Sequence, residues 1–361
     1  MTDAGERQEL LLVDALWNGD GFDGTTLLER DGDRLRVVPP PADGAPGVPA
    51  RHLGGTLIPS LTDHHVHLGL VDAAALFAGG LTRVIDLGWV PSVAAAWPAA
   101  HRDAGPEVAI AGGLITAPGG YPARSGWAPA GAAVEVHDAS GGRAAVRAQL
   151  ALSASRIKIT LNTDAGPTLD DGTLRAIVEE AHAAGVPVAC HAQGSGQAAR
   201  ALAAGVDQLA HTPYAERVPD GVIADAVAAG MTWVSTLDIN GWGDRTTAAH
   251  RFAFDNARRF LAAGGTILYG TDQGNGDLPA GVDARELQLL HDAGLTGAAL
   301  VRSIAGGTNQ AGAALVRNVA GGERTEVIGP RCAWLPTAPP ADDAVLPSWL
   351  ATARARFVRT L

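Results

Sequence analysis

Two histidines, His65 and His67, are separated by a single residue and follow the apolar stretch 56–60. We expect residues 56–60 to form a short buried strand. Because side chains alternate along an extended backbone, both imidazoles would lie on one side of the chain, whereas His64 would point away. Two adjacent imidazoles can hold one metal ion, but such a short motif is a weak signal by itself. Its meaning depends on the residues downstream.

The only lysine in the chain, Lys158, lies in the apolar β pattern of residues 156–161, although the chain has 27 basic residues. A buried primary amine can lose its charge and react as a neutral group, which a guanidinium does not do. One such reaction is carbamate formation with CO2, which produces an anionic oxygen ligand able to bridge two metals. The alternative is that Lys158 is a chance survivor of arginine-biased codon usage.

From residue 56 onward, short apolar strands alternate with Ala-rich helical stretches, as in repeated βα units. The expected strands are 56–60, 83–87, 108–116, 156–161, 186–191, 208–211, 232–237 and 266–271. Eight such units predict an α/β fold of the TIM (β/α)8 barrel class. A doubly wound open sheet is the alternative, but it normally carries a Gly-rich phosphate turn after its first strand, where this chain has His-x-His.

In a barrel of this kind the active site gathers at the carboxyl ends of the strands. The polar residues on or just after the expected strands would therefore face one mouth. They are His65, His67, Lys158, His191, His211 and Asp272. Each residue alone has an ordinary structural explanation, but six together favour a metal site.

The ends of the chain predict a second, smaller unit. Short alternating segments with tight turns fill residues 9–57. We expect residues 1–57 and 315–346 to form a small β-sandwich, residues 58–314 the metal-binding barrel, and residues 347–361 a C-terminal helix. That helix offers a surface for self-association as a homo-oligomer, which the sequence leaves open.

The overall composition limits the classes of partner that the protein is expected to bind. The net charge is −11, and the chain has no run of basic residues, which argues against nucleic-acid and anionic-membrane partners and favours a small-molecule substrate. Two cysteines cannot build a disulfide framework, and the first residues have no apolar signal region, so we expect a cytoplasmic protein. No apolar stretch approaches the roughly 20 residues of a membrane span.

As an ordered set, these motifs resemble the amidohydrolase superfamily of metal-dependent hydrolases, in its imidazolonepropionase-like and prolidase-like branch. The resemblance covers about residues 10–307. The segments that carry it are 54–67, 157–159, 190–192, 207–211 and 269–272. The chain departs from the family pattern at three places. Ser60 stands where Gly is usual, Tyr121 stands where Gly-Gly-His is common, and residues 329–334 lack the usual Ala-Asp.

The resemblance implies a (β/α)8 barrel, a β-sandwich built from both chain ends, and a binuclear metal centre. His65, His67 and Asp272 match ligands of the buried metal, and His191 and His211 match ligands of the more exposed metal. Lys158 matches a carboxylated lysine that bridges two divalent ions, for which Zn2+ suits the ligand types. Such a centre generates a hydroxide nucleophile, with Asp272 as the catalytic proton acceptor.

We therefore expect a hydrolase of a C–N bond in an amide or cyclic amide, such as an N-acyl amino acid or dipeptide. Three alternatives stay open: a lactonase or esterase, a deaminase of a heterocycle, and a metal-bound scaffold without turnover. Loop residues at the expected mouth are candidate substrate contacts, because arginine binds carboxylates and aromatic rings stack on flat groups. They are Tyr121, Arg124, Gln193 and Trp242.

Overall fold

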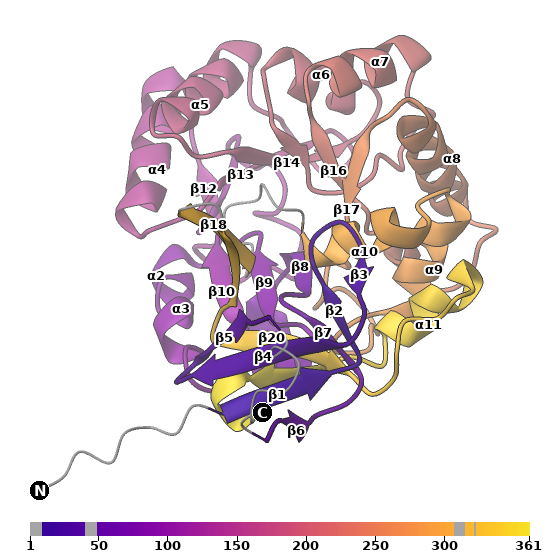
Figure 1. Ribbon diagram of the computed structural model, residues 1–361. Helices are drawn as coiled ribbons and strands as arrows, with labels where there is room; N and C mark the ends of the chain where they lie inside the picture. Colours follow the sequence, from indigo (N-terminus) through magenta and orange to yellow (C-terminus); the bar gives the residue numbers. More distant parts are fainter. Residues whose placement is uncertain (1–8, 40–48, 307–314, 321–322) are drawn as a thin grey trace, which may run out of the picture.

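The computed structural model describes residues 9–39, 49–306, 315–320 and 323–361. Parallel strands form the centre of the larger part of the molecule, and helices lie around their outside (Figure 1). The strands are β8 (Thr62–Val66), β9 (Arg83–Asp86), β10 (Glu107–Ile110), β11 (Leu114–Thr116), β12 (Ala133–Glu135), β13 (Ile157–Asn162), β14 (Val188–Gln193), β15 (Gln208–Leu209), β16 (Thr232–Val234) and β17 (Thr266–Leu268). The helices are α1 (Ala73–Ala78), α2 (Pro91–Ala94), α3 (Trp97–Ala100), α4 (Ala139–Ala151), α5 (Asp171–Ala183), α6 (Gln197–Ala203), α7 (Asp220–Ala228), α8 (Ala248–Ala262), α9 (Ala284–Asp292) and α10 (Gly297–Ala305).

The parallel strands belong to two hydrogen-bonded sheets, one in the order β10-β9-β8 and one in the order β12-β11-β13-β14-β15-β16-β17. Backbone hydrogen bonds connect the two sheets where β8 meets the segment after β17. The amide of His64 donates to the carbonyl of Tyr269 at 3.0 Å, and the amide of Asp272 donates to the carbonyl of His65 at 2.8 Å. His65 and Asp272, far apart in sequence, therefore lie side by side.

The position of the first parallel strand corrects the prediction. Residues Thr56–Ile58 form β7, which pairs with strands of the accessory sheet, and the first strand of the parallel set is Thr62–Val66. Pro59, which cannot donate a backbone hydrogen bond, directly follows β7. Because β8 begins at Thr62, His65 lies inside a buried strand and His67 immediately after it.

The expected strand 108–116 is divided into β10 and β11. Between them, Gly112 has a φ of +78°, and a Cβ there would lie 1.9 Å from Oε1 of Gln149. That oxygen accepts a hydrogen bond from the amide of Gly113 at 3.0 Å. Only glycine allows both this backbone conformation and this close approach of α4.

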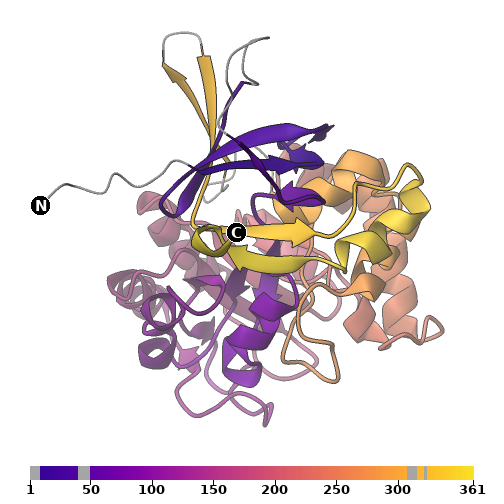
Figure 2. The same cartoon turned by 60° about the horizontal axis from the view of Figure 1, so that its bottom comes forward.

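Strands from both ends of the chain form two further sheets, and Figure 2 shows the N-terminal strands beside the C-terminal ones. Their order is β18-β19-β5-β4-β1-β6 and β21-β20-β7-β2-β3. The strands are β1 (Glu9–Val13), β2 (Ala15–Trp17), β3 (Phe22–Asp23), β4 (Thr26–Asp31), β5 (Arg34–Val37), β6 (Arg51–His52), β7 (Thr56–Ile58), β18 (Leu315–Ala320), β19 (Glu323–Ile328), β20 (Arg331–Leu335) and β21 (Arg354–Phe357).

The predicted C-terminal helix over residues 347–361 is wrong. The helix there, α11, covers only Leu346–Leu350, and the chain then turns back as β21, which pairs antiparallel with β20. Within β21 the burial alternates along Arg354–Phe357, with alanine inside and arginine outside, a period that suits a strand and not a helix. The predicted domain boundary at residue 314 lies outside the described residues.

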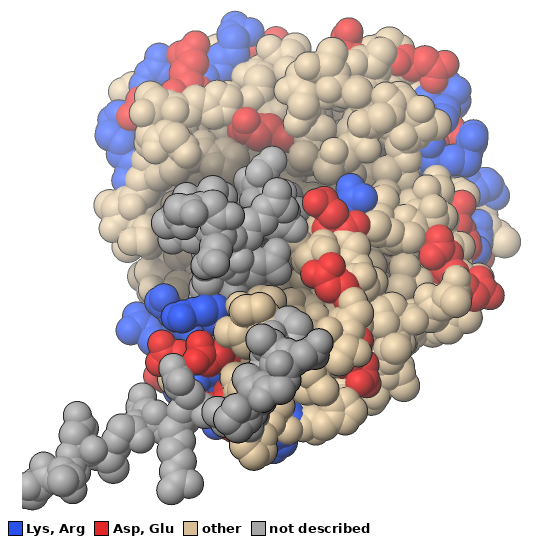
Figure 3. All heavy atoms as spheres, in the orientation of Figure 1, with Lys and Arg blue, Asp and Glu red and all other residues tan. Residues whose placement is uncertain are grey.

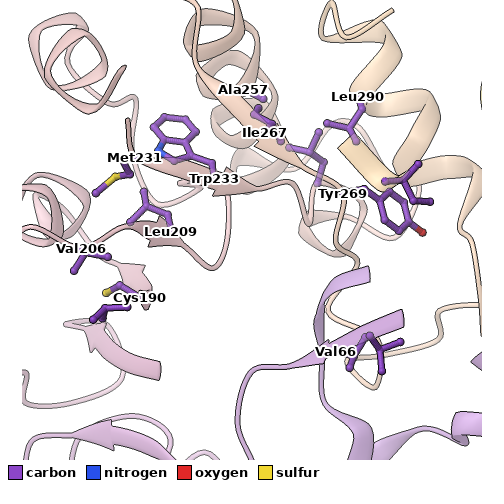
Figure 4. Close-up of a cluster of buried hydrophobic side chains, with 14 of the residues drawn as sticks. Val66, Cys190, Val206, Leu209, Met231, Trp233, Ala257, Ile267, Tyr269 and Leu290 are labelled. Atoms are coloured by element: carbon purple, nitrogen blue, oxygen red, sulfur yellow. The ribbon is translucent and has the colours of Figure 1, made fainter. Parts of the chain in front are cut away.

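The core lies between the parallel strands and the helices that cover them, and Figure 4 shows part of it. Trp233 of β16 is 1% exposed and stacks on Phe260 of α8, with ring centroids 3.9 Å apart and planes 6° apart. Among the described residues, no helix combines the length and apolar character that a membrane span requires.

Candidate metal centre

Three buried side chains converge where β8, the end of β15 and the end of β17 meet. Ligand atoms of His65, His211 and Asp272 all lie within 4.8 Å of one another. Nε2 of His65 is 3.2 Å from Oδ1 of Asp272, and Nε2 of His67 is 3.3 Å from the same oxygen. Among the described residues, His65 Nε2 and Asp272 Oδ1 have no hydrogen-bond partner. Two buried polar atoms thus face each other without a shared hydrogen bond.

Hydrogen bonds on the far side of three rings fix which nitrogen is available. Nδ1 of His65 lies 2.7 Å from the carbonyl of Ala210, and Nδ1 of His67 lies 3.0 Å from the carbonyl of Gly88. A carbonyl only accepts, so Nδ1 must donate and Nε2 keeps its electron pair. Nδ1 of His211 contacts Oγ1 of Thr236 at 2.9 Å, which leaves its Nε2 available. Outer hydrogen bonds of this kind orient metal-binding histidines.

His191, at the carboxyl end of β14, is held in the opposite sense. Its Nε2 lies 3.2 Å from both Asn162 Nδ2 and Gln193 Oε1, so Nδ1 is the ring nitrogen without these contacts. The ring is 4.8 Å from that of His211 and stacks on Tyr121, with centroids 4.6 Å apart and planes 20° apart. The structure therefore places His191 beside the other histidines.

Lys158 is 1% exposed and lies on β13, whose register pairs it with Ala189 on β14. Burial lowers the pKa of Lys158 to about 8, although Asp272 and Asp86 oppose the shift by favouring the charged amine. Only a small free-energy change then separates the ammonium from the neutral amine near neutral pH. A charged lysine carried by a buried strand needs anionic neighbours, and Asp272 is one of them.

A supporting residue that the sequence reasoning did not single out is Asp63. Its carboxylate accepts hydrogen bonds from the amide of His65 at 2.9 Å and from Oγ1 of Thr271 at 2.5 Å. It thereby ties β8 to the residue next to Asp272. Burial raises the pKa of Asp63 to about 7. An acid inside a buried apolar motif was the available signal, because such a group is retained only with hydrogen-bond partners.

A cavity of about 250 Å3 opens beside the cluster. It is lined by His67, Leu70, Tyr121, Trp127, Asp272, Gly274 and Asn275. Tyr121 is half-buried, and its hydroxyl oxygen accepts a hydrogen bond from Trp127 Nε1 at 3.0 Å. Two aromatic rings thus form part of the cavity wall.

The other candidate substrate contacts do not line this cavity. Arg124 is exposed, and Trp242 is 49% exposed; neither lines the cavity. Gln193 contacts His191, and its Oε1 accepts from Asn162 Nδ2 at 2.9 Å and from the hydroxyl of Tyr214 at 2.5 Å. Gln193 therefore positions a histidine, while Tyr121 is the predicted contact that reaches the cavity.

The donor set fits a divalent metal. Available imidazole nitrogens and a carboxylate oxygen are ligands that Zn2+ and related ions prefer. A cation between His65 Nε2 and Asp272 Oδ1 would satisfy two atoms that otherwise lack partners and would offset the charge of a 4% exposed carboxylate.

Two comparisons found known proteins to which this chain is similar. The model of the amidohydrolase family matches residues 56–311. Among solved structures, a Xaa-Pro dipeptidase with bound methionine has a TM-score of 0.73 at 20% identity, covering 96% of this chain and 97% of that chain. Ochratoxinase from A. niger has a TM-score of 0.72 at 19% identity, covering 96% and 94%. A prolidase complexed with N-methylphosphonate-L-proline has a TM-score of 0.71 at 19% identity, covering 96% and 97%. No curated protein matches the chain.

Proposed function

The chain belongs to the amidohydrolase family and is a hydrolytic enzyme, and from this premise we propose that it cleaves a C–N bond in an amide or cyclic amide with bound divalent metal ions. The observation that carries the proposal is the approach of His65 Nε2 and Asp272 Oδ1, two buried atoms with no hydrogen-bond partner among the described residues. Bound ions would activate a water molecule and polarise the scissile carbonyl.

We assign two metal positions, with zinc as the favoured ion. His65, His67 and Asp272 would hold the inner ion, and His191 and His211 the outer one. Lys158 would bridge the two ions as a carbamate, formed when its neutral amine adds to CO2 and releases a proton. The burial of Lys158 and its place on β13, next to the strand that carries His191, support this assignment.

The proposed architecture is a closed (β/α)8 barrel with a β-sandwich from both chain ends. The bonds from His64 to Tyr269 and from Asp272 to His65 support closure, because they join β8, at the edge of one parallel sheet, to the segment that follows β17, at the edge of the other. Closure would bring the ligands to one mouth, at the carboxyl ends of the strands.

Within this site Asp272 would transfer the proton of the attacking water to the leaving group. Oδ1 faces the two histidines, whereas Oδ2 accepts a hydrogen bond from Asn275 Nδ2 at 2.9 Å. We assign Asp272 as the acceptor of the water proton and its donor to the departing amine, the role that general acid–base catalysis requires. The φ of +61° at Asp272 is a conformation that Asp tolerates better than most residues, and it aims the carboxylate at the histidines.

The substrate class we propose is an N-acyl amino acid or a dipeptide-like amide. The names of two similar structures, a Xaa-Pro dipeptidase and a prolidase, support a peptide-type bond. In the cavity, Tyr121 and Trp127 provide aromatic surface for a flat or apolar substituent. Gln193 would act indirectly by orienting His191.

Hydrolysis of a mixed panel tests this function. Purified enzyme is assayed on N-acyl amino acids, Xaa-Pro and other dipeptides, cyclic amides, esters, lactones and amino-substituted heterocycles, with chelator-treated enzyme as the control. We expect amide cleavage that chelation removes. Cleavage of esters or lactones alone would replace the amide assignment, and ammonia release from heterocycles alone would indicate a deaminase.

A further inference from the structure

A second cavity, of about 300 Å3, lies at the amino-terminal ends of the parallel strands. Its lining includes Arg83, Val188, Gln208 and Thr232, each the first residue of its strand, and Arg156, directly before β13. The candidate metal ligands His191 and His211 lie at or after the carboxyl ends of β14 and β15. The two cavities are therefore at opposite ends of the same strands.

His64 lines this second cavity and has no assigned role in the candidate metal centre. It is 3% exposed, and neither of its ring nitrogens has a hydrogen-bond partner among the described residues. Along β8 its neighbour His65 serves the metal centre, so alternation sends His64 to the other side, as the sequence predicts. A buried imidazole with both nitrogens unpartnered indicates that a polar group is missing from the cavity.

Arg156 gives a second, independent indication that the cavity accommodates a polar ligand. Its Nη1 donates to Gln208 Oε1 at 3.2 Å, and its buried Nε has no partner among the described residues. No carboxylate of the described residues lies within ion-pair distance of this guanidinium. Desolvation and the nearby Arg83 lower the pKa of Arg156 to about 10. A cation in this position requires an anion, because a partly buried charge is normally paired.

Two acids lie close to the cavity: Asp207, which lines it, and Glu107, which pairs with Arg83. Asp207 Oδ2 accepts from the amide of Val188 at 2.7 Å and lies 2.8 Å from His182 Nε2. Glu107 Oε1 lies 3.2 Å from Arg83 Nε, but the Glu107 side chain is 55% exposed, and Arg83 Nε makes no hydrogen bond to any described residue. Arg156 is left without a counter-ion among the residues that the structure describes.

We propose that this cavity binds a small oxyanion, a carboxylate or phosphate group, through Arg156, His64 and Arg83. A guanidinium offers several N–H donors to two oxygens of such a group, and a neutral imidazole adds one more. Apolar lining residues would contact a short organic body attached to it. They are Ile85, Pro187, Val188, Ala189 and Leu268. The site is separate from the proposed hydrolase activity and does not depend on it.

Isothermal titration of the metal-loaded enzyme with inorganic phosphate, and separately with butyrate, tests the proposal. We expect saturable binding of at least one anion, weakened about tenfold or more in Arg156→Gln, because charge-assisted hydrogen bonds are lost. Arg175→Gln removes an exposed arginine of α5 and should bind as the wild type does. Because an anion on the metal centre would still bind to Arg156→Gln, that variant distinguishes the two sites.

Circular dichroism and metal content check that each variant is folded and loaded. If Arg156→Gln does not fold, Arg83→Gln carries the same expectation of weakened binding. A preference for phosphate would identify a phosphorylated ligand, and a preference for butyrate an organic acid. Absence of saturable binding of either anion to the wild type, or equal affinity in wild type and the folded arginine variant, would overturn the proposal.

Discussion

At the scale of single residues, the site depends on which atom of each side chain is free. His65 and His67 use Nδ1 for backbone carbonyls and keep Nε2, whereas His191 keeps Nδ1 because Asn162 and Gln193 contact its Nε2. The histidines thus differ in which ring nitrogen is free of these contacts. The partners on the far side of each ring make this choice.

Replacing Asp272 with Asn should lower kcat about a hundredfold or more, because an amide cannot accept the proton and general acid–base groups contribute on this order. Much of the metal should stay bound, since the histidines remain. The matched control is Asp277→Asn, an exposed acid of the same loop, which should retain full activity. Steady-state kinetics and elemental analysis measure both effects. Activity of Asp272→Asn within about tenfold of wild type would rule out the assigned role.

Tyr121 is the residue to change for specificity. Tyr121→Ala removes a wall of the 250 Å3 cavity and the ring that stacks on His191, so KM for substrates with aromatic or apolar substituents should rise. Tyr121→Phe keeps the ring and loses only the hydrogen bond from Trp127, so its KM should stay close to that of the wild type. Kinetics on the amide panel distinguish the two variants. Identical KM values for Tyr121→Ala and the wild type would remove Tyr121 from substrate binding.

The residue pattern predicts a metal site of six residues, and the structure places ligand atoms of three of them, His65, His211 and Asp272, within 4.8 Å of one another. Strand parity and the strand-end rule predicted that His65, His67, Lys158, His191, His211 and Asp272 lie together. These two rules could not predict the position of Arg124, because the position of an exposed loop residue depends on the conformation of the loop and not on a periodic pattern. Nor could they find the hydrogen bonds of Asp63 to Thr271, which join residues 208 positions apart.

At the scale of elements, helices packed on the parallel strands hold in place the strands that carry the candidate ligands. The burial pattern of the strands was predictable, because apolar runs mark buried strands. Which strand pairs with which was not predictable. The apolar run Thr56–Ile58 would suit the parallel sheet or the accessory sheet equally well, and its pairing with β20 depends on residues nearly 280 positions later. The predicted C-terminal helix is wrong for the same reason, because β21 pairs with β20, a strand that local sequence does not reveal as its partner.

The packing of β16 on α8 makes a prediction about stability. Trp233→Ala should lower the free energy of unfolding by about 3–5 kcal/mol, because it empties a site in which the indole stacks on Phe260. Trp242→Ala is the matched control: its side chain is 49% exposed, so the change should stay within about 0.5 kcal/mol. Denaturant unfolding followed by circular dichroism measures both. Equal stability of the two variants would contradict this view of the core.

At the scale of the whole molecule, both chain ends contribute strands to the same two sheets, and β7 leads from one of them directly into β8, which carries His65. Acidic and basic side chains are interspersed on the face that Figure 3 shows. The candidate metal centre and the proposed oxyanion cavity lie at opposite ends of the parallel strands.

The central claim is a binuclear metal centre with Lys158 as its bridge, and metal content tests it most directly. Elemental analysis of the purified enzyme should give close to two divalent ions per chain, with a carboxylated Lys158 in a crystal map. Lys158→Met keeps the length and burial of the side chain but cannot form a carbamate. This variant should fold and bind close to one divalent ion per chain. Wild-type protein that binds no metal, or Lys158→Met that still binds two ions, would contradict the account.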